Sequence, residues 1–435
     1  MKYANQVSEI INAFSPEPLK IEQMTFFYCD DTMEYRTSDK YTSPIEDIFE
    51  TCTENQEPHA FLLLGHRGCG KSTELNHLSS RLINNGCPVK TIACSLDLDL
   101  LNLVYSDLFI LMGEALLQIA NETNCALNQE LTNKINEFWD QATKISISQE
   151  LAATSVESGL SMKTPKFFAN IFELFAEIKA NLKFNEETRT EYRKQINIRS
   201  SEWLKLLSDV TKEIKNTTNH LPIIILEDLD KLNPENAWNV FYHYAALLSG
   251  MPFTVIYTFP IGLSYDTKFS SMEAYFITQT LPMIKIENID GSPCLGGIEI
   301  IERIVKKRAD LHLFEEQVLD TLIRLTGGSL RDLFHVINAA AKRANRRKSS
   351  TISMEDAARA LEELKTTLTK RIEKDDYKFL TNIYCSNKEL IENKQALLHM
   401  LQASVVLEYN GKRWHNVHPL VIQFLKEQGF LKENP

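Results

Sequence analysis

The 435-residue chain has no C-x-x-C pair among its 8 cysteines, so it lacks the spacing of a zinc ribbon or of a disulfide framework. It also lacks any run of the roughly 18 uncharged apolar residues that a membrane span needs, and its first residues contain no apolar signal core. The most apolar stretch, residues 108–120, follows Asp107 and is interrupted by Glu114. These absences predict reduced thiols, no membrane segment and a cytoplasmic location.

The chain also lacks an excess of positive charge. The net charge of −11 argues against a protein that coats nucleic acid through its overall charge, although a local basic face stays open. With 43% hydrophobic and 24% charged residues, the composition is that of an ordinary soluble protein. The length allows two or three domains with cores of their own. No kinase-type catalytic loop is present, which argues against kinase activity.

The central feature of the sequence is residues 61–73, where the apolar run Phe-Leu-Leu-Leu leads into Gly-His-Arg-Gly-Cys-Gly-Lys-Ser-Thr. This matches G-x-x-x-x-G-K-[ST], in which backbone N–H groups surround phosphates, the lysine reaches the outer phosphates and the hydroxyl holds Mg²⁺. Leu75, Leu78 and Leu82 follow at helical spacing, which places a helix N-terminus at the anion. A strand before and a helix after favour an ATP and Mg²⁺ site over a chance glycine turn. The expected contacts are Gly65, His66, Arg67, Gly68, Cys69, Gly70, Lys71, Ser72 and Thr73, with Ser72 as a metal ligand.

A second apolar strand ends in acids. Residues 221–232 are Leu-Pro-Ile-Ile-Ile-Leu-Glu-Asp-Leu-Asp-Lys-Leu, and a continuously apolar strand is typical of a buried parallel sheet whose carboxyl end binds ligands. Glu227 and Asp228 are therefore candidates for holding Mg²⁺ through water and for polarising an attacking water, as in P-loop NTPases. Which acid performs which role stays open. A solvated acidic turn is expected to account for Asp230.

Further strands are expected at residues 89–94, 253–258 and 282–286. The strand at residues 282–286 is expected to complete the sheet. The strand at residues 253–258 ends in Thr258, which is a candidate polar sensor near the γ-phosphate. The alternative is that Thr258 is a plain capping hydroxyl. The pattern predicts an α/β fold, a P-loop NTPase parallel sheet of the AAA+ or additional-strand (ASCE) type, over residues 61–295. Residues 102–210 show helical periodicity and predict a helical insertion in this core.

Residues 1–60 are expected to form an N-terminal extension that includes a short β-like run at 24–29. Residues 296–365 are wholly helical in pattern and predict a small helical lid. Within it, Gly327 and Gly328 end one helix and Ser329 caps the next, which places Arg331 in a first helical turn. We expect Arg331 to move onto the ATP γ-phosphate when the lid closes, with a salt bridge to a neighbouring acid as the alternative.

Residues 366–435 have the outline of a winged helix, with a hairpin at Asn410-Gly411. The presumptive recognition helix, residues 393–402, has one lysine and no arginine, which is little for phosphate contacts. Lys412 and Arg413 at the wing tip are better DNA candidates. A basic run at residues 342–348 is explained more simply by the dipole of a helix C-terminus. The module is therefore expected to bind protein or to pack on its own core, and DNA contact remains open.

The order of these motifs resembles the AAA+ and STAND group of P-loop ATPases, in particular initiator ATPases of the origin-recognition type. It is also similar to bacterial KAP-like ATPases that carry G-H-x-G-x-G-K-S-T-E-L and D-D-L-D-K-L motifs. The resemblance implies an ATPase core, a lid with a sensor arginine and a C-terminal winged helix. The chain departs from the pattern at Glu227, where most relatives have aspartate. Arg303 and Arg308 lie near the lid entrance, and nothing in the spacing marks either as an arginine finger.

The sequence thus predicts an ATP-dependent molecular switch that couples hydrolysis of ATP to engagement of a protein partner, with a homo-oligomer remaining open. A DNA-binding ATPase similar to initiators or transposition regulators is the first alternative. The second is a signalling scaffold that binds ATP without hydrolysing it, for instance in defence against phage.

Overall fold

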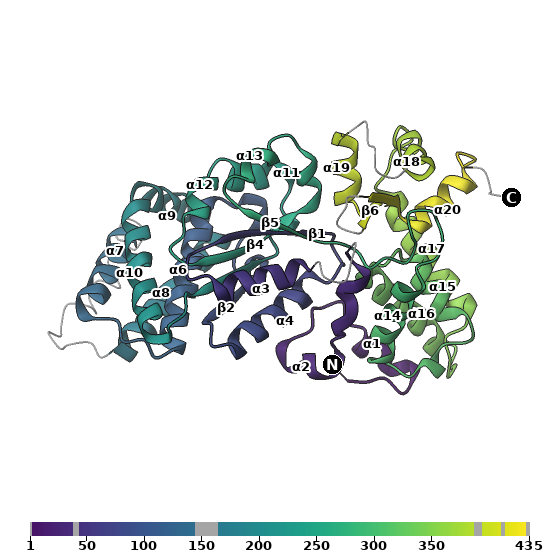
Figure 1. The fold of residues 1–435 in the computed structure, drawn as a ribbon, viewed down its shortest axis with the longest axis horizontal. Coiled ribbons are helices and arrows are strands. Elements are labelled where there is room, and N and C mark those ends of the chain that lie inside the picture. Colours follow the sequence, from purple (N-terminus) through teal and green to yellow (C-terminus); the bar gives the residue numbers. More distant parts are fainter. Residues whose placement is uncertain (1, 38–42, 144–163, 387–393, 410–413, 432–435) are drawn as a thin grey trace.

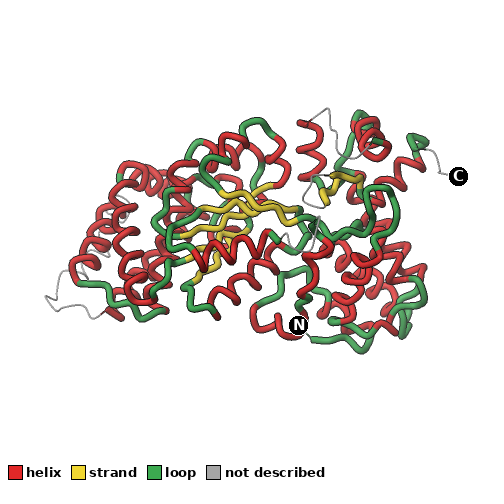
Figure 2. The backbone as a smooth tube through the Cα atoms, viewed as in Figure 1, coloured by secondary structure: helices red, strands yellow, loops and turns green. Residues whose placement is uncertain are grey.

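The computed structural model describes residues 2–37, 43–143, 164–386, 394–409 and 414–431. Its centre is a sheet of five strands in the order β2-β3-β4-β1-β5, in which every neighbouring pair is parallel. The strands are β1 (Ala60–Gly65), β2 (Val89–Ala93), β3 (Ile223–Glu227), β4 (Thr254–Pro260) and β5 (Ile277–Leu281). Figure 2 shows these strands as a central layer with helices on both sides. Because β4 lies between β1 and β3, the sheet has the predicted additional-strand arrangement, and the predicted P-loop NTPase fold is confirmed.

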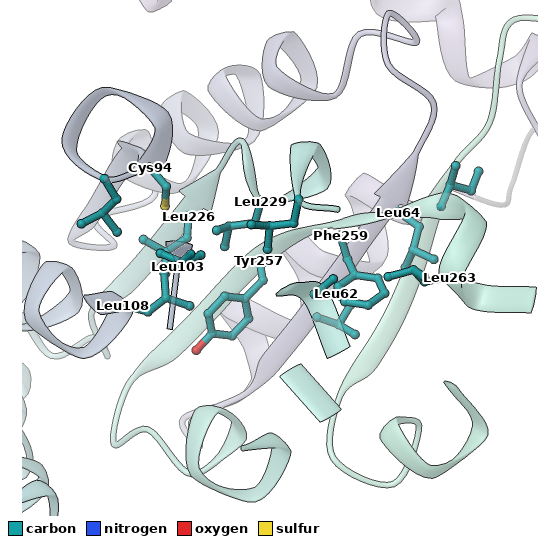
Figure 3. Close-up of a cluster of buried hydrophobic side chains, with 14 of the residues drawn as sticks. Leu62, Leu64, Cys94, Leu103, Leu108, Leu226, Leu229, Tyr257, Phe259 and Leu263 are labelled. Carbon is teal, nitrogen blue, oxygen red and sulfur yellow. The ribbon is translucent and has the colours of Figure 1, made fainter. Parts of the chain in front are cut away.

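Alternate residues of each strand enter different cores, as the two-residue period of a strand requires. Leu62 and Leu64 of β1 join one buried cluster together with Tyr257 and Leu108 (Figure 3). Phe61 and its alternate neighbours face the opposite layer. Both faces are therefore covered, which explains why the strands are continuously apolar.

Short elements connect and cover the strands. The phosphate-loop helix is α4, and the helix before β1 is α3. The bounds are α3 (Pro44–Glu54), α4 (Lys71–Asn84), α5 (Cys94–Asp97), η3 (Leu100–Asn102), η4 (Leu229–Lys231), α11 (Pro234–Ala237), η5 (Trp238–Tyr242), α12 (Ala245–Ser249), η6 (Ile261–Tyr265), α13 (Phe269–Met272) and η7 (Leu311–Leu313).

Two sequence predictions about strands are wrong. The fifth strand occupies residues 277–281, not 282–286, because Pro282 has no N–H to continue the ladder. Residues 24–29 do not form a β-like run: most of them belong to α2 (Ile21–Phe27). Its exposed start and buried Met24 and Phe27 fit a short amphipathic helix that packs against the core.

Five helices fill the predicted insertion between β2 and β3. They are α6 (Tyr105–Glu122), α7 (Gln129–Thr143), α8 (Thr164–Phe184), α9 (Glu186–Ile198) and α10 (Ser200–Thr218). Figure 1 shows them at the end of the sheet opposite to the C-terminus. Phe138, Trp139 and Trp203 pack against one another with ring centroids about 5 Å apart. The Ser- and Thr-rich tip predicted at residues 145–162 lies outside the described residues.

The chain after the sheet forms the α14–α17 bundle, against which the N-terminal elements pack (Figure 1). The bundle comprises α14 (Leu295–Lys306), α15 (Val318–Leu325), α16 (Leu330–Arg346) and α17 (Met354–Thr369), and the N-terminal elements are η1 (Val7–Glu9), α1 (Ile10–Ala13) and η2 (Asp30–Tyr35). The Asn338 side chain of α16 donates to the Phe14 carbonyl at 2.7 Å. In the basic run at the end of α16, Arg343 pairs with Glu363 and Arg347 pairs with Asp356. Two of its arginines therefore hold the bundle together.

We call residues 376–427 the C-terminal module. It comprises α18 (Asp376–Cys385), α19 (Lys394–Gln402), the antiparallel hairpin of β6 (Val406–Tyr409) and β7 (Trp414–Val417), and α20 (Pro419–Glu427). The presumptive recognition helix α19 lies against η6 of the core, since a Cβ on Gly262 would stand 2.7 Å from the Leu398 carbonyl oxygen. The wing tip with Lys412 and Arg413 falls outside the described residues. Across the described part of the chain, no helix has the length and apolar character to cross a membrane.

Candidate functional site

A cavity of about 480 Å³ opens at the carboxyl ends of β1 and β3. Six segments that are separated in the sequence line it: parts of residues 16–36, the loop between β1 and α4 with the start of α4, the end of β2 with α5, the end of β3 with the turn after it, residues 304–308, and the start of α16. Figure 1 shows these parts meeting where the sheet adjoins the α14–α17 bundle. In open parallel α/β sheets this edge is where ligands bind.

The loop between β1 and α4 curls as the sequence predicts. Gly68 and Gly70 have φ values of +90° and +102°, and α4 begins at Lys71 directly after them. Such a turn directs backbone N–H groups inward and adds the positive end of a helix dipole. Six of the nine predicted contact residues line the cavity: Arg67, Gly68, Gly70, Lys71, Ser72 and Thr73.

Lys71 is buried, and its ammonium group is nevertheless fully engaged. It donates to the carbonyls of Gly65 at 2.7 Å and His66 at 2.9 Å, and it lies 2.9 Å from an Asp230 carboxylate oxygen. Burial alone would lower the pKa of Lys71, but Asp230 raises it above its usual value. Burial likewise opposes the charge on Asp230, and Lys71 holds the pKa of that carboxyl below its usual value. Asp230 is therefore part of the site and not of a solvated turn.

Glu227 at the end of β3 faces Ser72 at the start of α4. The Ser72 side chain lies near enough to the Glu227 carboxylate to favour its charged form, and the Oε1 atom of Glu227 is buried and has no hydrogen-bond partner among the described residues. Burial, with a further contribution from Asp228, raises the pKa of Glu227 to about 7. A carboxylate in this setting gains from a nearby cation, which would favour its charged form.

Asp228 follows in a left-handed conformation, with φ of +72°, which is uncommon for a residue other than glycine. Its carboxylate has partners that differ from those of Glu227. One carboxylate oxygen accepts from the Ser95 hydroxyl, and the other lies 2.5 Å from the Lys231 ammonium group. Both acids line the cavity, so the structure brings together the predicted pair while giving each a different environment.

Thr258 lies behind the acidic turn. Its hydroxyl oxygen accepts from the Leu229 N–H at 3.0 Å and lies 3.4 Å from the Leu226 carbonyl oxygen. It is buried and is not among the residues that line the cavity. In this arrangement Thr258 braces the turn that carries the two acids, as the capping alternative expects, and its role as a sensor stays a prediction.

Three predicted contact residues, Gly65, His66 and Cys69, do not line the cavity. His66 points to the C-terminal module instead, where its Nε2 atom accepts from the Glu408 N–H at 2.8 Å. Burial, with the nearby Lys71 charge, lowers the pKa of His66 to about 4, so the ring is neutral and can act as an acceptor. The loop thereby contacts the hairpin of the C-terminal module directly.

The loop also contacts the start of α16. The Gly68 carbonyl accepts from the N–H groups of Leu330 at 3.1 Å and Arg331 at 3.4 Å. A Cβ on Gly68 would stand 2.7 Å from the Cβ of Arg331, so only glycine allows this approach. Arg331 lines the cavity, and no carboxylate of the described residues lies within 4.0 Å of its guanidinium group. The structure thus places Arg331 in the first turn of α16, as predicted, and beside the loop, without the alternative salt bridge; its movement onto the γ-phosphate stays a prediction.

Two buried arginines stand in the cavity wall: Arg36, which sequence reasoning missed, and Arg308, which it placed near the lid entrance without a role. Arg36 donates to the Pro282 carbonyl at 2.7 Å and reaches to 3.4 Å of the place where a Cβ on Gly70 would be. Arg308 stands at the end of α14, over the ring of Phe334. No local motif marks Arg36, because its partner Pro282 lies 246 positions away in the chain.

The residues present fit a nucleotide with Mg²⁺. Ser72 and the unpartnered oxygen of Glu227 supply hard oxygen donors, and Lys71, Arg36 and Arg331 supply positive charge. Among the described residues there is no group of three or more His, Cys, Asp or Glu that could hold a metal ion alone.

The sheet order, the glycine loop at a helix N-terminus and the acids at the end of the neighbouring strand define a P-loop NTPase with an AAA+-like fold. Comparison of sequences agrees. The chain belongs to the KAP family, because the model described as "KAP family P-loop domain" matches residues 39–268, more than half of its length. The predicted KAP-like membership is therefore confirmed.

Matches to solved structures span nearly the whole chain at low identity. The structure of Cdc6p from Pyrobaculum aerophilum has 14% identity and a TM-score of 0.40, and the match covers 97% of this chain and 98% of that chain. The Aeropyrum pernix ORC1 protein in complex with DNA has 12% identity and a TM-score of 0.39, over 96% and 98%. The Thermotoga maritima RuvB Holliday junction branch migration motor has 11% identity and a TM-score of 0.35, over 93% and 100%. No curated protein matches the chain.

The raised pKa of Glu227 predicts a pH-dependent change in stability. In protein freed of metal and nucleotide, ionising this buried carboxyl opposes folding, so its contribution to stability falls as pH rises from 4.5 to about 7. Near pH 8, the free energy of unfolding of Glu227→Gln should therefore be about 2 kcal/mol higher than that of the natural protein. This difference should disappear near pH 5. Chemical denaturation at the two pH values measures this, with the exposed Glu273→Gln as the control. A variant that is less stable near pH 8 would contradict the assignment.

Proposed function

We propose that this protein is an ATP-driven molecular switch, in which binding and hydrolysis of ATP change how the α14–α17 bundle and the C-terminal module contact the phosphate loop. The observation that carries the proposal is the pair of contacts made by that loop. Gly68 accepts from the start of α16, and His66 accepts from β6. A ligand that binds the loop's N–H groups and Lys71 therefore binds a segment that contacts both the α14–α17 bundle and the C-terminal module.

In this proposal Glu227 and Asp228 have different roles, one toward Mg²⁺ and the other toward the attacking water. Glu227 lies next to Ser72 and keeps an unpartnered oxygen, which supports it as the metal-side acid. The Asp228 carboxylate is held by Ser95 and Lys231 and lines the cavity, which supports it as the acid that orients the attacking water. Bound Mg²⁺ would supply charge neutralisation at the phosphates. The protein's own contribution is positioning, with Arg331 as the positive group that links the bundle to the γ-phosphate.

Partner engagement follows from the same geometry. The bundle serves as a lid in this proposal because Arg331 lies at its edge facing the loop. The C-terminal module is held by its hairpin and by α19, whose Leu398 lies against η6. Since α19 is occupied by the protein's own core, the observations support a protein partner more than a DNA groove. No feature of the described residues favours DNA over protein.

Asp228→Asn tests hydrolysis and separates a switch from a scaffold that only binds ATP. Loss of the carboxylate that orients water should slow single-turnover hydrolysis about 100-fold, within the range that general-base groups contribute. The affinity for ATP should change by less than about threefold, because Asp228 is not expected to hold the metal. Asp209→Asn on the surface of α10 is the control. Equal hydrolysis rates in the variant and the natural protein would support the scaffold.

His66 tests the link from the loop to the C-terminal module. In the natural protein, a non-hydrolysable ATP analogue should change amide hydrogen exchange in β6 about tenfold, because the Glu408 N–H is bonded to the loop. His66→Ala should abolish this response, whereas His66→Gln retains a side-chain acceptor and should keep part of it. Two results would show that the module is not coupled through this bond. One is an exchange rate in β6 of the natural protein that does not change when the nucleotide analogue binds, and the other is a response that is retained in His66→Ala.

A further inference from the structure

The α15–α16 turn, residues 326–329, lies directly before Arg331 in the chain. Ser329 caps α16 through its side chain, which accepts from the Asp332 N–H at 3.3 Å, and Arg331 belongs to the first turn of that helix. The N–H group of Arg331 also donates to the Gly68 carbonyl of the glycine loop. The place of the α15–α16 turn therefore decides where the Arg331 side chain stands relative to the loop.

Two other parts of the protein are in close contact with the α15–α16 turn. A Cβ on Gly328 would stand 2.1 Å from the carbonyl oxygen of Ile284, which belongs to the chain after β5. A Cβ on Gly327 would stand 2.7 Å from the Leu407 side chain of β6 and 3.0 Å from Pro419 at the start of α20. The turn is thus packed against both the core and the C-terminal module, so a shift of the module would move the turn.

Tyr409 at the end of β6 makes a hydrogen bond to this turn. Its hydroxyl donates to the Gly327 carbonyl at 2.7 Å, and both residues are buried. The Tyr409 ring stacks on Trp414 of β7, with ring centroids 4.7 Å apart, which limits its freedom to move. A buried carbonyl that loses its donor costs about 1–3 kcal/mol, so the bond keeps the hairpin and the turn together.

A bond that merely fastens the C-terminal module to the bundle is the alternative role for Tyr409. The module is fastened to the bundle elsewhere, because α20 packs against α17 and Glu427 pairs with Lys365 at 2.9 Å (Figure 1). The Tyr409 bond instead reaches the turn that precedes Arg331. Tyr409 is not among the residues that line the cavity, so its effect on the nucleotide has to pass through other residues. Arg331 is the charged cavity residue that follows the turn.

We propose that Tyr409 is a positioning residue for ATP hydrolysis, which holds the α15–α16 turn so that Arg331 stands beside the glycine loop. This inference rests on the proposed function, since it assumes that Arg331 acts on the γ-phosphate. It assigns to the C-terminal module a direct influence on the reaction. A partner that shifts the hairpin would change the rate of hydrolysis without touching the nucleotide.

The test is a double-mutant cycle measured by single-turnover hydrolysis of ATP. Tyr409→Phe removes one hydroxyl group and should slow hydrolysis about tenfold, within the loss that a misplaced positioning group causes. In the background of Arg331→Gln, the same change should slow hydrolysis by less than about twofold, because the residue through which Tyr409 acts is already absent. The affinity of Tyr409→Phe for ADP, which lacks the γ-phosphate, should stay within about twofold of that of the natural protein.

Tyr257→Phe is the matched control. Tyr257 is also buried, and its hydroxyl donates to the Leu248 carbonyl at 3.0 Å, away from the residues that line the cavity. This variant should lose stability as Tyr409→Phe does and hydrolyse ATP at the natural rate. If Tyr409→Phe fails to fold, Leu407→Val shortens the other hairpin side chain that contacts the turn and should give the same pattern of rates.

Three results would overturn the inference alone. They are an unchanged rate in Tyr409→Phe while Arg331→Gln is slow, an equal slowing by Tyr409→Phe with and without Arg331, and an equal slowing in Tyr257→Phe. A natural rate in Arg331→Gln would instead show that the role proposed for Arg331 is wrong, and the inference would fail with it. The two kinds of failure are therefore distinguished by the single variant Arg331→Gln.

Discussion

The buried ammonium group of Lys71 is the constraint on which the site depends. A lysine this deeply buried needs a full set of acceptors, and it finds them in two carbonyls of its own loop and in Asp230 after β3. The ion pair ties the glycine loop to the end of the neighbouring strand, across more than 150 residues of intervening chain. Breaking such a buried pair on one side costs about 3–5 kcal/mol, so the loop conformation and the acidic turn are set together.

This constraint explains how a phosphate group could act at a distance. Phosphate oxygens that bind Lys71 would replace acceptors that now hold the loop to the β3 turn. In the same loop, the Gly68 carbonyl accepts hydrogen bonds from the start of α16, and the His66 side chain accepts one from the backbone N–H of Glu408. A change at one lysine thus reaches the α14–α17 bundle and the C-terminal module through single hydrogen bonds. Such a coupling needs two alternative packings of these parts, not a gradual deformation.

The sequence predicts the parts of the site that local patterns encode. The glycine loop, Ser72, the Glu227-Asp228 pair and Arg331 are each marked by a motif or a cap, and the structure places them in or beside one cavity. Arg36 escapes prediction because its place in the site depends on a contact with Pro282, 246 positions away in the chain.

Two further differences have local causes. His66 lies within the motif yet faces away from the cavity, since only the fold brings β6 to that side of the loop. The fifth strand is misplaced by five residues because apolar character continues past Pro282, although the proline ends the ladder. The winged-helix outline stays a prediction, as the wing tip falls outside the described residues.

The central claim is that Lys71 binds the triphosphate, and its most direct test removes the lysine without leaving a buried charge unpaired. Labelled ATP is titrated into Asp230→Asn and into the double variant Lys71→Met with Asp230→Asn. The account predicts that Asp230→Asn alone binds ATP at least as tightly as the natural protein, because the lysine is released from its partner. The double variant should bind about 10- to 100-fold more weakly, as expected for loss of a charged hydrogen-bond donor. Equal affinity of the two variants would contradict the account.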